Sequence, residues 1–252
     1  MSGRNLYTVI SNDRLAPNVF KMVLLGDTHH ISAPGQFVNI ELPGRFLRRP
    51  ISVCDYDAST ITLVYKVVGA GTQQMSELPV ATTLDMLTGL GNGFDTSVSG
   101  EMPLLVGGGV GIPPLYALAK RLIDEGKRPQ VALGFNTASE VFLYEDFRNL
   151  GIDAFLATVD GAAGCRGIIT DAIVRHKLQY DYLYACGPLP MLKALYDVTA
   201  IDGQFSFEER MGCGFGGCMG CSCRTLNGYK RICTEGPVLF RAEILWETAE
   251  CR

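Results

Sequence analysis

Short runs of alternating apolar and polar residues fill the first hundred positions of this 252-residue chain. A period of two is typical of half-buried strands, and the turn residues between the runs indicate an antiparallel β-barrel or sandwich. Residues 72–78 instead predict one short helix. The expected strands are residues 6–11, 19–25, 36–41, 51–56, 60–68 and 83–88.

From residue 101 the pattern changes to buried strands that alternate with helices. Such units are typical of a Rossmann-like parallel sheet with helices on both faces, which binds ligands beyond the carboxyl ends of its strands. The expected strands are residues 103–106, 130–135, 153–159 and 182–185, and the expected helices are 113–125, 143–150, 170–175 and 190–199. The ligand-binding ends then fall at residues 107–111, 135–137, 160–161 and 186–188.

A third pattern begins at residue 204. A strand at 204–207 leads into a glycine-rich cysteine loop, and residues 236–240 are typical of a closing strand. With 47% hydrophobic residues, the chain is long enough to give two domains and a small appendage their own cores. We therefore predict three units: a β-barrel at 1–100, a Rossmann-like domain at 101–203 and a cluster module at 204–252.

The cysteine loop carries the most specific chemistry. Cys213, Cys218 and Cys221 are spaced C-x4-C-x2-C, and Cys233 follows after a short insert, which is the ligand pattern of a plant-type [2Fe–2S] cluster. Glycines between the ligands allow the backbone to approach closely and to direct N–H groups at sulfur. Cys223 lies outside the ligand pattern, and we expect it to pack near the cluster.

Two other uses of these cysteines stay open. A structural zinc site would use two CxxC pairs, but Cys218 and Cys221 have no partner pair at comparable spacing. A disulfide knot is disfavoured because the N-terminal residues contain no apolar stretch of a signal peptide. The remaining cysteines, Cys54, Cys165 and Cys251, are isolated and are expected to be structural.

Two weaker motifs lie in the first unit. Residues 48–52, RRPIS, offer a guanidinium for a diphosphate and a hydroxyl for a ring nitrogen. Residues 69–72, GAGT, offer backbone N–H groups for a phosphate. Taken alone, a basic pair beside a proline is more often a solvated turn, and a GxGT segment is more often a simple helix cap.

The first strand of the second unit ends in a glycine loop formed by Gly107, Gly108, Gly109 and Gly111. The loop continues as GxGxxP and lacks the third glycine of the Rossmann fingerprint, so it is a partial match to a dinucleotide site. Residues 129–147 contain no Lys or Arg that could bind a 2′-phosphate. This absence favours NAD over NADP.

A second strand end, at Cys186, Gly187 and Pro188, has two interpretations. The Cys186 thiol could lie beside a nicotinamide ring. A cysteine in an apolar strand is also commonly a small buried hydrophobic residue. The sequence leaves both open.

Charge and composition disfavour other classes. A net charge of −4 without clustered Lys and Arg argues against a nucleic-acid partner. The uncharged residues 102–119 contain glycine and proline runs that would break a spanning helix, so we expect no membrane span. Thiols without a secretory context fit a reducing cytoplasm. His29, His30 and His176 lie among polar residues and are expected at the surface.

Taken together, the motifs are similar to those of one family. RRPIS, GAGT, GGGVGIPPL, CGPLPM and ERMGCGFGGCMGCSC, with the distal Cys233, resemble in order the electron-transfer subunits of class 1B, NAD-dependent dihydroorotate dehydrogenase. Those subunits belong to the ferredoxin reductase superfamily and end in a [2Fe–2S] module. The resemblance spans essentially the whole chain, and the cysteine loop is its most specific part.

The resemblance implies roles for individual residues. It implies FAD contacts at Arg49, Pro50, Ile51 and Ser52, with Ile51 standing where broader ferredoxin reductases have a stacking tyrosine. Further flavin contacts are implied on one strand and one turn, at Tyr65, Lys66, Val67, Gly71 and Thr72. The four cluster ligands match Cys213, Cys218, Cys221 and Cys233.

The implied activity is electron relay. Dihydroorotate would be oxidised on an FMN-containing partner subunit, and electrons would pass through the cluster and FAD to NAD+, in a heterotetramer of two chains of each kind. A cluster carries single electrons and a nicotinamide takes a hydride pair, so a flavin must lie between them. The alternatives are a flavin and iron–sulfur subunit of another oxidoreductase, of the ferredoxin:NADP oxidoreductase or sulfide dehydrogenase type, and a redox-sensing regulatory module.

Overall fold

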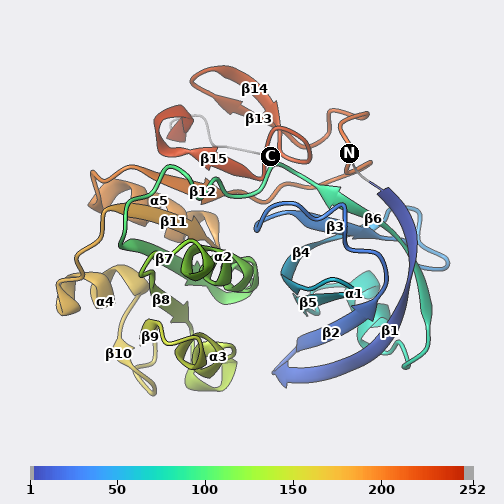
Figure 1. Cartoon of the computed structure of the whole chain (residues 1–252), viewed down its shortest axis with the longest axis horizontal. Coiled ribbons are helices and arrows are strands. Elements are labelled where there is room, and N and C mark those ends of the chain that lie inside the picture. The colour runs from blue at the N-terminus through green and yellow to red at the C-terminus, as the bar shows by residue number, and fades with distance from the viewer. Residues whose placement is uncertain (1–2, 247–252) are drawn as a thin grey trace.

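The computed structural model describes residues 3–246, and its first unit is a closed barrel of antiparallel strands (Figure 1). The strands follow the order β1-β2-β5-β4-β3-β6 around the barrel, which decides between barrel and sandwich. Inward side chains such as Val38, Ile40 and Leu63 form its core. The elements are β1 (Gly3–Ala16), β2 (Val19–Leu25), β3 (Phe37–Ile40), β4 (Arg49–Tyr56), β5 (Thr60–Lys66), α1 (Ala70–Ser76) and β6 (Thr83–Leu90).

The first strand is longer than its alternating pattern predicts. Its first half pairs with β6, from Gly3 to Thr8, and its second half pairs with β2, from Thr8 to Ala16. Because it has a partner strand along its whole length, β1 continues beyond the apolar alternation at residues 6–11 and closes the barrel.

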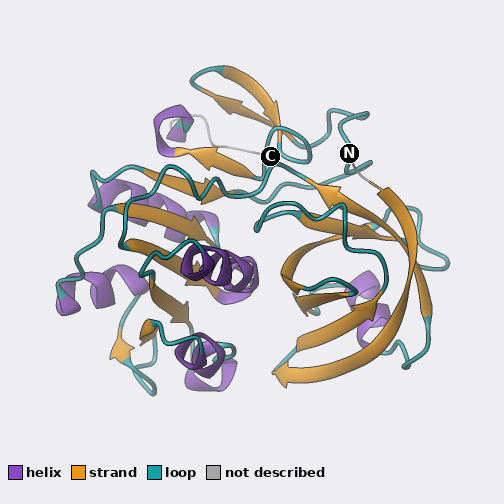
Figure 2. Ribbon diagram, in the orientation of Figure 1, coloured by secondary structure: helices purple, strands orange, loops and turns teal. Residues whose placement is uncertain are grey.

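The second unit is a twisted sheet with helices on both faces (Figure 2). Seven strands have the order β10-β9-β8-β7-β11-β12-β15, and all neighbours are parallel except the edge strand β15. Helices α2 and α3 pack with barrel residues on one face, and α4 and α5 pack on the other. The elements are β7 (Pro103–Gly108), η1 (Gly109–Gly111), α2 (Pro113–Asp124), β8 (Gln130–Phe135), η2 (Ala138–Glu140), α3 (Tyr144–Asn149), β9 (Asp153–Thr158), β10 (Cys165–Arg166), α4 (Ile169–His176), β11 (Tyr182–Cys186) and α5 (Leu189–Val198).

The third segment is joined to the Rossmann-like sheet by shared strands. β12 (Gly203–Ser206) pairs parallel with β11, and β15 (Val238–Phe240) pairs antiparallel with β12. The cysteine loop and the hairpin of β13 (Ser222–Thr225) and β14 (Gly228–Arg231) rise between these two strands, at the top of Figure 1. The short helix η3 (Arg241–Glu243) follows β15. The unit boundaries themselves stay a prediction.

Apolar contacts connect all three segments. Phe37 and Leu90 of the barrel lie in one buried cluster with Phe205, Cys221 and Cys233. A second buried cluster joins the barrel to α2, beside an ion pair between Lys120 Nζ and Asp55 Oδ1 at 2.7 Å. No helix within residues 3–246 is long and apolar enough to cross a membrane.

Candidate functional site

The four predicted cluster ligands lie together as two pairs. The side chain of Cys213 contacts that of Cys218, and the side chain of Cys233 contacts that of Cys221. Cys218 is exposed and Cys213 half-buried, whereas Cys221 and Cys233 are each 2% exposed. One pair therefore lies near the surface and the other in the interior.

This pairing favours a binuclear cluster over a single zinc ion. Zinc–sulfur bonds of about 2.3 Å place the sulfurs of a tetrahedral site about 3.8 Å apart. Within residues 3–246, no three of these four sulfur atoms lie within 4.8 Å of one another. Two pairs of sulfurs instead fit two irons, each with two thiolate ligands.

Backbone N–H groups converge on the sulfurs, as the glycine content predicts. Gly217 N–H donates to Cys213 Sγ at 3.2 Å, and Gly216 N–H donates to Cys233 Sγ at 3.1 Å. Gly216 has φ +88°, a conformation that side chains disfavour. Burial alone would raise the pKa of the Cys213 thiol, but N–H donation from Phe215 and Cys218 lowers this pKa to about 7. The loop thus favours the thiolate of Cys213, the form that binds iron, whereas burial raises the pKa of the Cys233 thiol to about 12.

Arg231 of the hairpin braces the loop from outside. Its Nη1 donates to the Gly216 carbonyl at 3.0 Å, and its guanidinium forms an ion pair with Glu235. Hydrogen bonding to Arg231 lowers the pKa of Glu235 to about 2, so the pair stays ionised. Asn92 of the barrel holds the segment after Cys233, since its Nδ2 donates to the Val238 carbonyl at 2.8 Å.

The spare cysteines lie as follows. Cys223 is buried in the same apolar cluster as Cys221 and Cys233, as predicted. Cys54 and Cys165 are buried, and Cys165 Sγ lies 3.2 Å from Nε2 of the exposed His176. The prediction for Cys251 falls outside the described residues.

The two weaker barrel motifs meet in space. A Cβ atom at Gly71 would lie 2.0 Å from Arg49 Nε, so the Arg49 side chain crosses directly over the GAGT turn. Arg48, by contrast, is paired with Glu41 and Asp85. The guanidinium of Arg49 bonds to the backbone carbonyls of Leu47 and Arg48. Arg49 is therefore the member of the pair suited to a diphosphate, which is the role that the resemblance implies for it.

Other predicted flavin contacts face in different directions. Pro50 and Ser52 are half-buried, whereas Ile51 packs against the barrel core. Tyr65 is 2% exposed and its hydroxyl donates to Asn12 Oδ1 at 2.9 Å, so its side chain lies inside the barrel. The next predicted contacts lie where β5 ends and α1 begins: Lys66, Val67 and Thr72. The Thr72 hydroxyl closes the GAGT turn, because it accepts the Val68 N–H at 2.9 Å.

A cavity of about 560 Å³ lies at the carboxyl edge of the sheet, the place predicted for a dinucleotide. One wall is the glycine loop with Gly108, Gly109 and Gly111, and another is Gly187 with Pro188. The barrel contributes Lys66, and the segment after β12 contributes Glu208. Desolvation in this position raises the pKa of Glu208. The sequence motifs did not indicate that Glu208 belongs to this cavity.

Two glycines of the loop are required by close packing. A Cβ atom at Gly111 would lie 2.4 Å from the Cys186 carbonyl oxygen, and one at Gly107 would lie 2.7 Å from Ile112. Of the described residues, Gly187 and Pro188 line the cavity and Cys186 does not. Burial raises the pKa of the Cys186 thiol to about 12, which suits the buried hydrophobic interpretation.

The end of β8 carries an acidic group where a ribose would bind. Asn136 and Glu140 both line the cavity, and Asn136 Nδ2 donates to Glu140 Oε2 at 3.2 Å. A carboxylate accepts a hydrogen bond from a 2′-hydroxyl and repels a 2′-phosphate. This geometry agrees with the preference for NAD.

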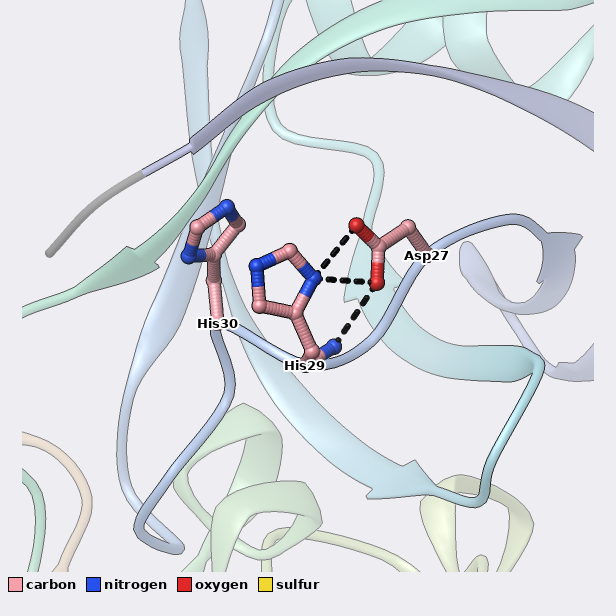
Figure 3. Close-up of side chains that lie close together, drawn as sticks. All are labelled: Asp27, His29 and His30. Atoms are coloured by element: carbon pink, nitrogen blue, oxygen red, sulfur yellow. Dashed lines mark hydrogen bonds and ion pairs between the residues drawn. The ribbon is translucent and has the colours of Figure 1, made fainter.

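A separate group of possible metal ligands lies on the barrel surface (Figure 3). His29 Nδ1 lies 2.5 Å from the Asp27 carboxylate, and the His29 and His30 rings are 3.7 Å apart. His29 is exposed and His30 half-buried, as the surface prediction required. The Asp27 carboxylate already contacts one ring nitrogen of His29.

These features define a class of protein. A six-stranded antiparallel barrel, a Rossmann-like sheet with a dinucleotide-sized cavity, and a loop of four paired cysteines together describe a flavin and iron–sulfur oxidoreductase of the ferredoxin reductase type. The comparisons with known proteins agree with this class.

Residues 208–245 match the family model described as the iron-sulfur cluster binding domain of dihydroorotate dehydrogenase B. The chain is 42% identical over 250 residues to the dihydroorotate dehydrogenase B (NAD(+)) electron transfer subunit of Geobacillus sp. (strain WCH70), covering 94% of this chain and 97% of the relative. It is 43% identical to the subunit of the same name from Bacillus pumilus (strain SAFR-032), covering 94% and 95%. The chain belongs to the family of dihydroorotate dehydrogenase B electron transfer subunits.

Solved structures support the same fold. A structure of NADH-dependent reduced ferredoxin-NADP oxidoreductase matches with a TM-score of 0.87 and 29% identity, covering 98% of this chain and 92% of that one. A ferredoxin reductase in carbazole 1,9a-dioxygenase matches with a TM-score of 0.66 and 25% identity, covering 78% and 64%. The three-unit arrangement is therefore shared with the first of these flavin oxidoreductases over nearly the whole chain.

Proposed function

We propose that this chain relays electrons from an FMN-containing dihydroorotate dehydrogenase subunit to NAD+ through a [2Fe–2S] cluster and FAD. The observation that supports this most directly is that one strand, β3, adjoins both the flavin motif and the buried cysteines. Phe37 of β3 pairs with Ser52 of β4 and packs in the buried cluster of Cys221 and Cys233. A bound flavin supplies the exchange between single electrons and a hydride pair.

The residues of the chain bind and orient the cofactors. Cys213, Cys218, Cys221 and Cys233 would hold the two irons. Arg49 would neutralise the FAD diphosphate beside the GAGT turn, where the absence of a side chain at Gly71 leaves room for the guanidinium.

The cavity would hold NAD+ with its reactive end toward the barrel. Ile168, Pro188 and Met191 contribute apolar walls to the cavity. The cavity also has two charged lining residues, Lys66 from the barrel and Glu208 from the segment after β12. Both would orient the polar groups of the nucleotide.

We further propose that the partner docks on the apolar face beside the cluster. This docking face consists of exposed side chains on the cysteine loop and the hairpin: Phe215, Met219, Leu226 and Tyr229. Tyr229 is 74% exposed, and side chains of this kind are enriched where partners bind. The complete assembly would be a heterotetramer of two chains of each kind.

Reconstitution with an FMN-containing catalytic subunit tests the proposal. The loaded chain should form a stable complex and support NADH formation from dihydroorotate and NAD+. Tyr229→Asp should weaken the complex at least about tenfold, whereas Val174→Asp, at an exposed apolar position on α4, should not. No NADH formation from two fully loaded subunits would contradict the relay. A redox-sensing module would show no NADH oxidation with an artificial acceptor either.

A further inference from the structure

Asn39 connects the barrel to the cysteine loop. It lies on β3 with 1% of its surface exposed, and its Nδ2 donates to the carbonyl oxygen of Cys213 at 3.2 Å. Cys213 is the first cluster ligand and stands 174 positions later in the chain. One buried amide therefore bonds directly to the backbone of a ligand.

Strand alternation places this amide between the two candidate cofactor sites. Val38 and Ile40 point into the barrel, so Phe37 and Asn39 face outward, where the third segment covers them. The cross-strand partner of Asn39 is Pro50 of the flavin motif. The loop between β12 and β13 lies over this end of the barrel, near β3 and β6 (Figure 1). Asn39 is thus adjacent to both the flavin strand and the cluster loop.

The loop is shaped to receive the amide. Gly214 has φ +79°, and a Cβ atom there would lie 2.4 Å from Asn39 Nδ2, so a side chain at Gly214 would displace Asn39. Within the described residues, Asn39 Oδ1 is buried without a hydrogen-bond partner. A buried polar group with an unsatisfied atom costs free energy that an apolar residue of similar size would avoid. Packing alone therefore does not explain why an asparagine stands at position 39.

We propose that Asn39 is a positioning residue for the cluster, which fixes the Cys213 side of the cysteine loop against the flavin-binding strand. Reduction potentials of iron–sulfur clusters depend on hydrogen bonding and solvent exposure around the sulfurs, and both depend on where this loop lies. Electron transfer between two redox groups also requires that the distance between them be fixed. This inference rests on the proposed presence of both cofactors and adds the residue that sets their alignment.

The test uses the full chain loaded with FAD and cluster, without any partner subunit. Asn39→Asp keeps the shape but cannot donate to the Cys213 carbonyl and adds negative charge beside an anionic site. Asn39→Ala removes the contact without adding charge. Gln36→Ala is the matched control, because Gln36 is a buried amide directly before β3 whose Nε2 bonds to the Gly91 carbonyl, just after β6, at 2.9 Å.

The measurements are the rate of cluster reduction by NADH, the cluster potential and its electron paramagnetic resonance spectrum, each normalised to bound iron. We expect Asn39→Asp to slow cluster reduction about tenfold, the effect of one lost hydrogen bond, to lower the potential and to alter the spectrum. Asn39→Ala should do so less, and Gln36→Ala should match the wild type. NADH oxidation by a flavin-directed acceptor should stay within about twofold in all three.

The outcomes separate this inference from the proposed function. Loss of the cluster in both Asn39 variants but not in Gln36→Ala would also support the role of Asn39. Wild-type rate, potential and spectrum in both Asn39 variants would overturn it, as would equal cluster loss in Gln36→Ala. Failure of the wild-type chain to reduce its cluster with NADH would instead contradict the relay itself.

Discussion

The cysteine loop and the nucleotide cavity achieve binding in opposite ways. Three of the four cluster ligands come from one short glycine-rich loop, and the groups that donate to their sulfurs are backbone N–H groups of the same loop. The cavity instead takes walls from the barrel, from several strand ends and from the segment after β12. The first site is specified locally and the second by packing between units, so substitutions should affect them through different mechanisms.

Loss of a buried cluster ligand should have the largest effect. Cys221→Ser should abolish iron binding, because serine is a poor iron ligand and the position is 2% exposed. The nucleotide cavity is assembled elsewhere, so NADH oxidation through the flavin should persist. Cys223→Ser is the matched control, since Cys223 is buried nearby but outside the ligand pairs. Iron and sulfide content measure the difference, and equal iron loss in both variants would contradict the ligand assignment.

Crowding of the glycine loop should have the converse effect. Gly111→Ala places a methyl group 2.4 Å from the Cys186 carbonyl oxygen. The glycine loop after β7 must therefore move away from the carboxyl end of β11. We expect kcat/KM for NADH to fall by roughly 10- to 100-fold with iron content unchanged. Gly126→Ala, at the other end of α2, meets nothing within 4 Å and should lower stability without changing kcat/KM. Wild-type kinetics of Gly111→Ala would refute the close-packing role.

The two adjacent arginines allow a finer test at the flavin site. Arg49→Gln should weaken FAD binding by roughly 10- to 100-fold, because it removes the cation that lies over the GAGT turn. Arg48→Gln should weaken FAD less and lower the denaturation midpoint more, since Arg48 pairs with Glu41 and Asp85. FAD affinity of the deflavinated chain distinguishes them. Equal affinities in the two variants would mean that this assignment is wrong.

The smallest effect concerns the outer brace of the cysteine loop. The pKa of Glu235 is lowered to about 2 by Arg231, so its stabilising contribution is complete above the ordinary pKa of 4.5 and is lost as pH falls toward 2. Glu235→Gln should therefore lower the denaturation midpoint slightly at pH 7, and this difference from the wild type should shrink at pH 3. If the difference in denaturation midpoint between Glu235→Gln and the wild type grew as the pH fell, the predicted direction of the pH dependence would be wrong. Glu145→Gln, in an exposed pair with Arg148, is the control.

The same contrast explains what the sequence could predict. The cysteine loop, the barrel alternation and the strand–helix units depend on neighbours in the chain, and the predicted bounds of β2 and β8 agree with the structure. Helix α1 begins two residues earlier than predicted, and the short strand β10 was missed because two residues carry no pattern. The strand alternation of Ile61, Leu63 and Tyr65 could have placed Tyr65 inside the barrel.

Features that depend on contacts between distant parts of the chain could not be predicted from the sequence. Nothing near Asn39 in the sequence indicates a bond to Cys213, because the two meet only when the third segment folds over β3. Glu208 likewise enters the cavity only through the pairing of β12 with β11. The resemblance indicated Arg49 rather than Arg48, but the reason that Arg48 is engaged elsewhere, its pairing with carboxylates from β6 and from the residue after β3, is visible only in the structure.

The most direct test of the relay is an anaerobic titration of the purified chain with NADH. Chemical analysis should first give about two irons, about two sulfides and about one FAD per chain. NADH should then bleach the flavin and the cluster absorption, and the reduced cluster should give an electron paramagnetic resonance signal. A chain that contains both cofactors but whose cluster stays oxidised after full flavin reduction would contradict electron transfer between the two sites.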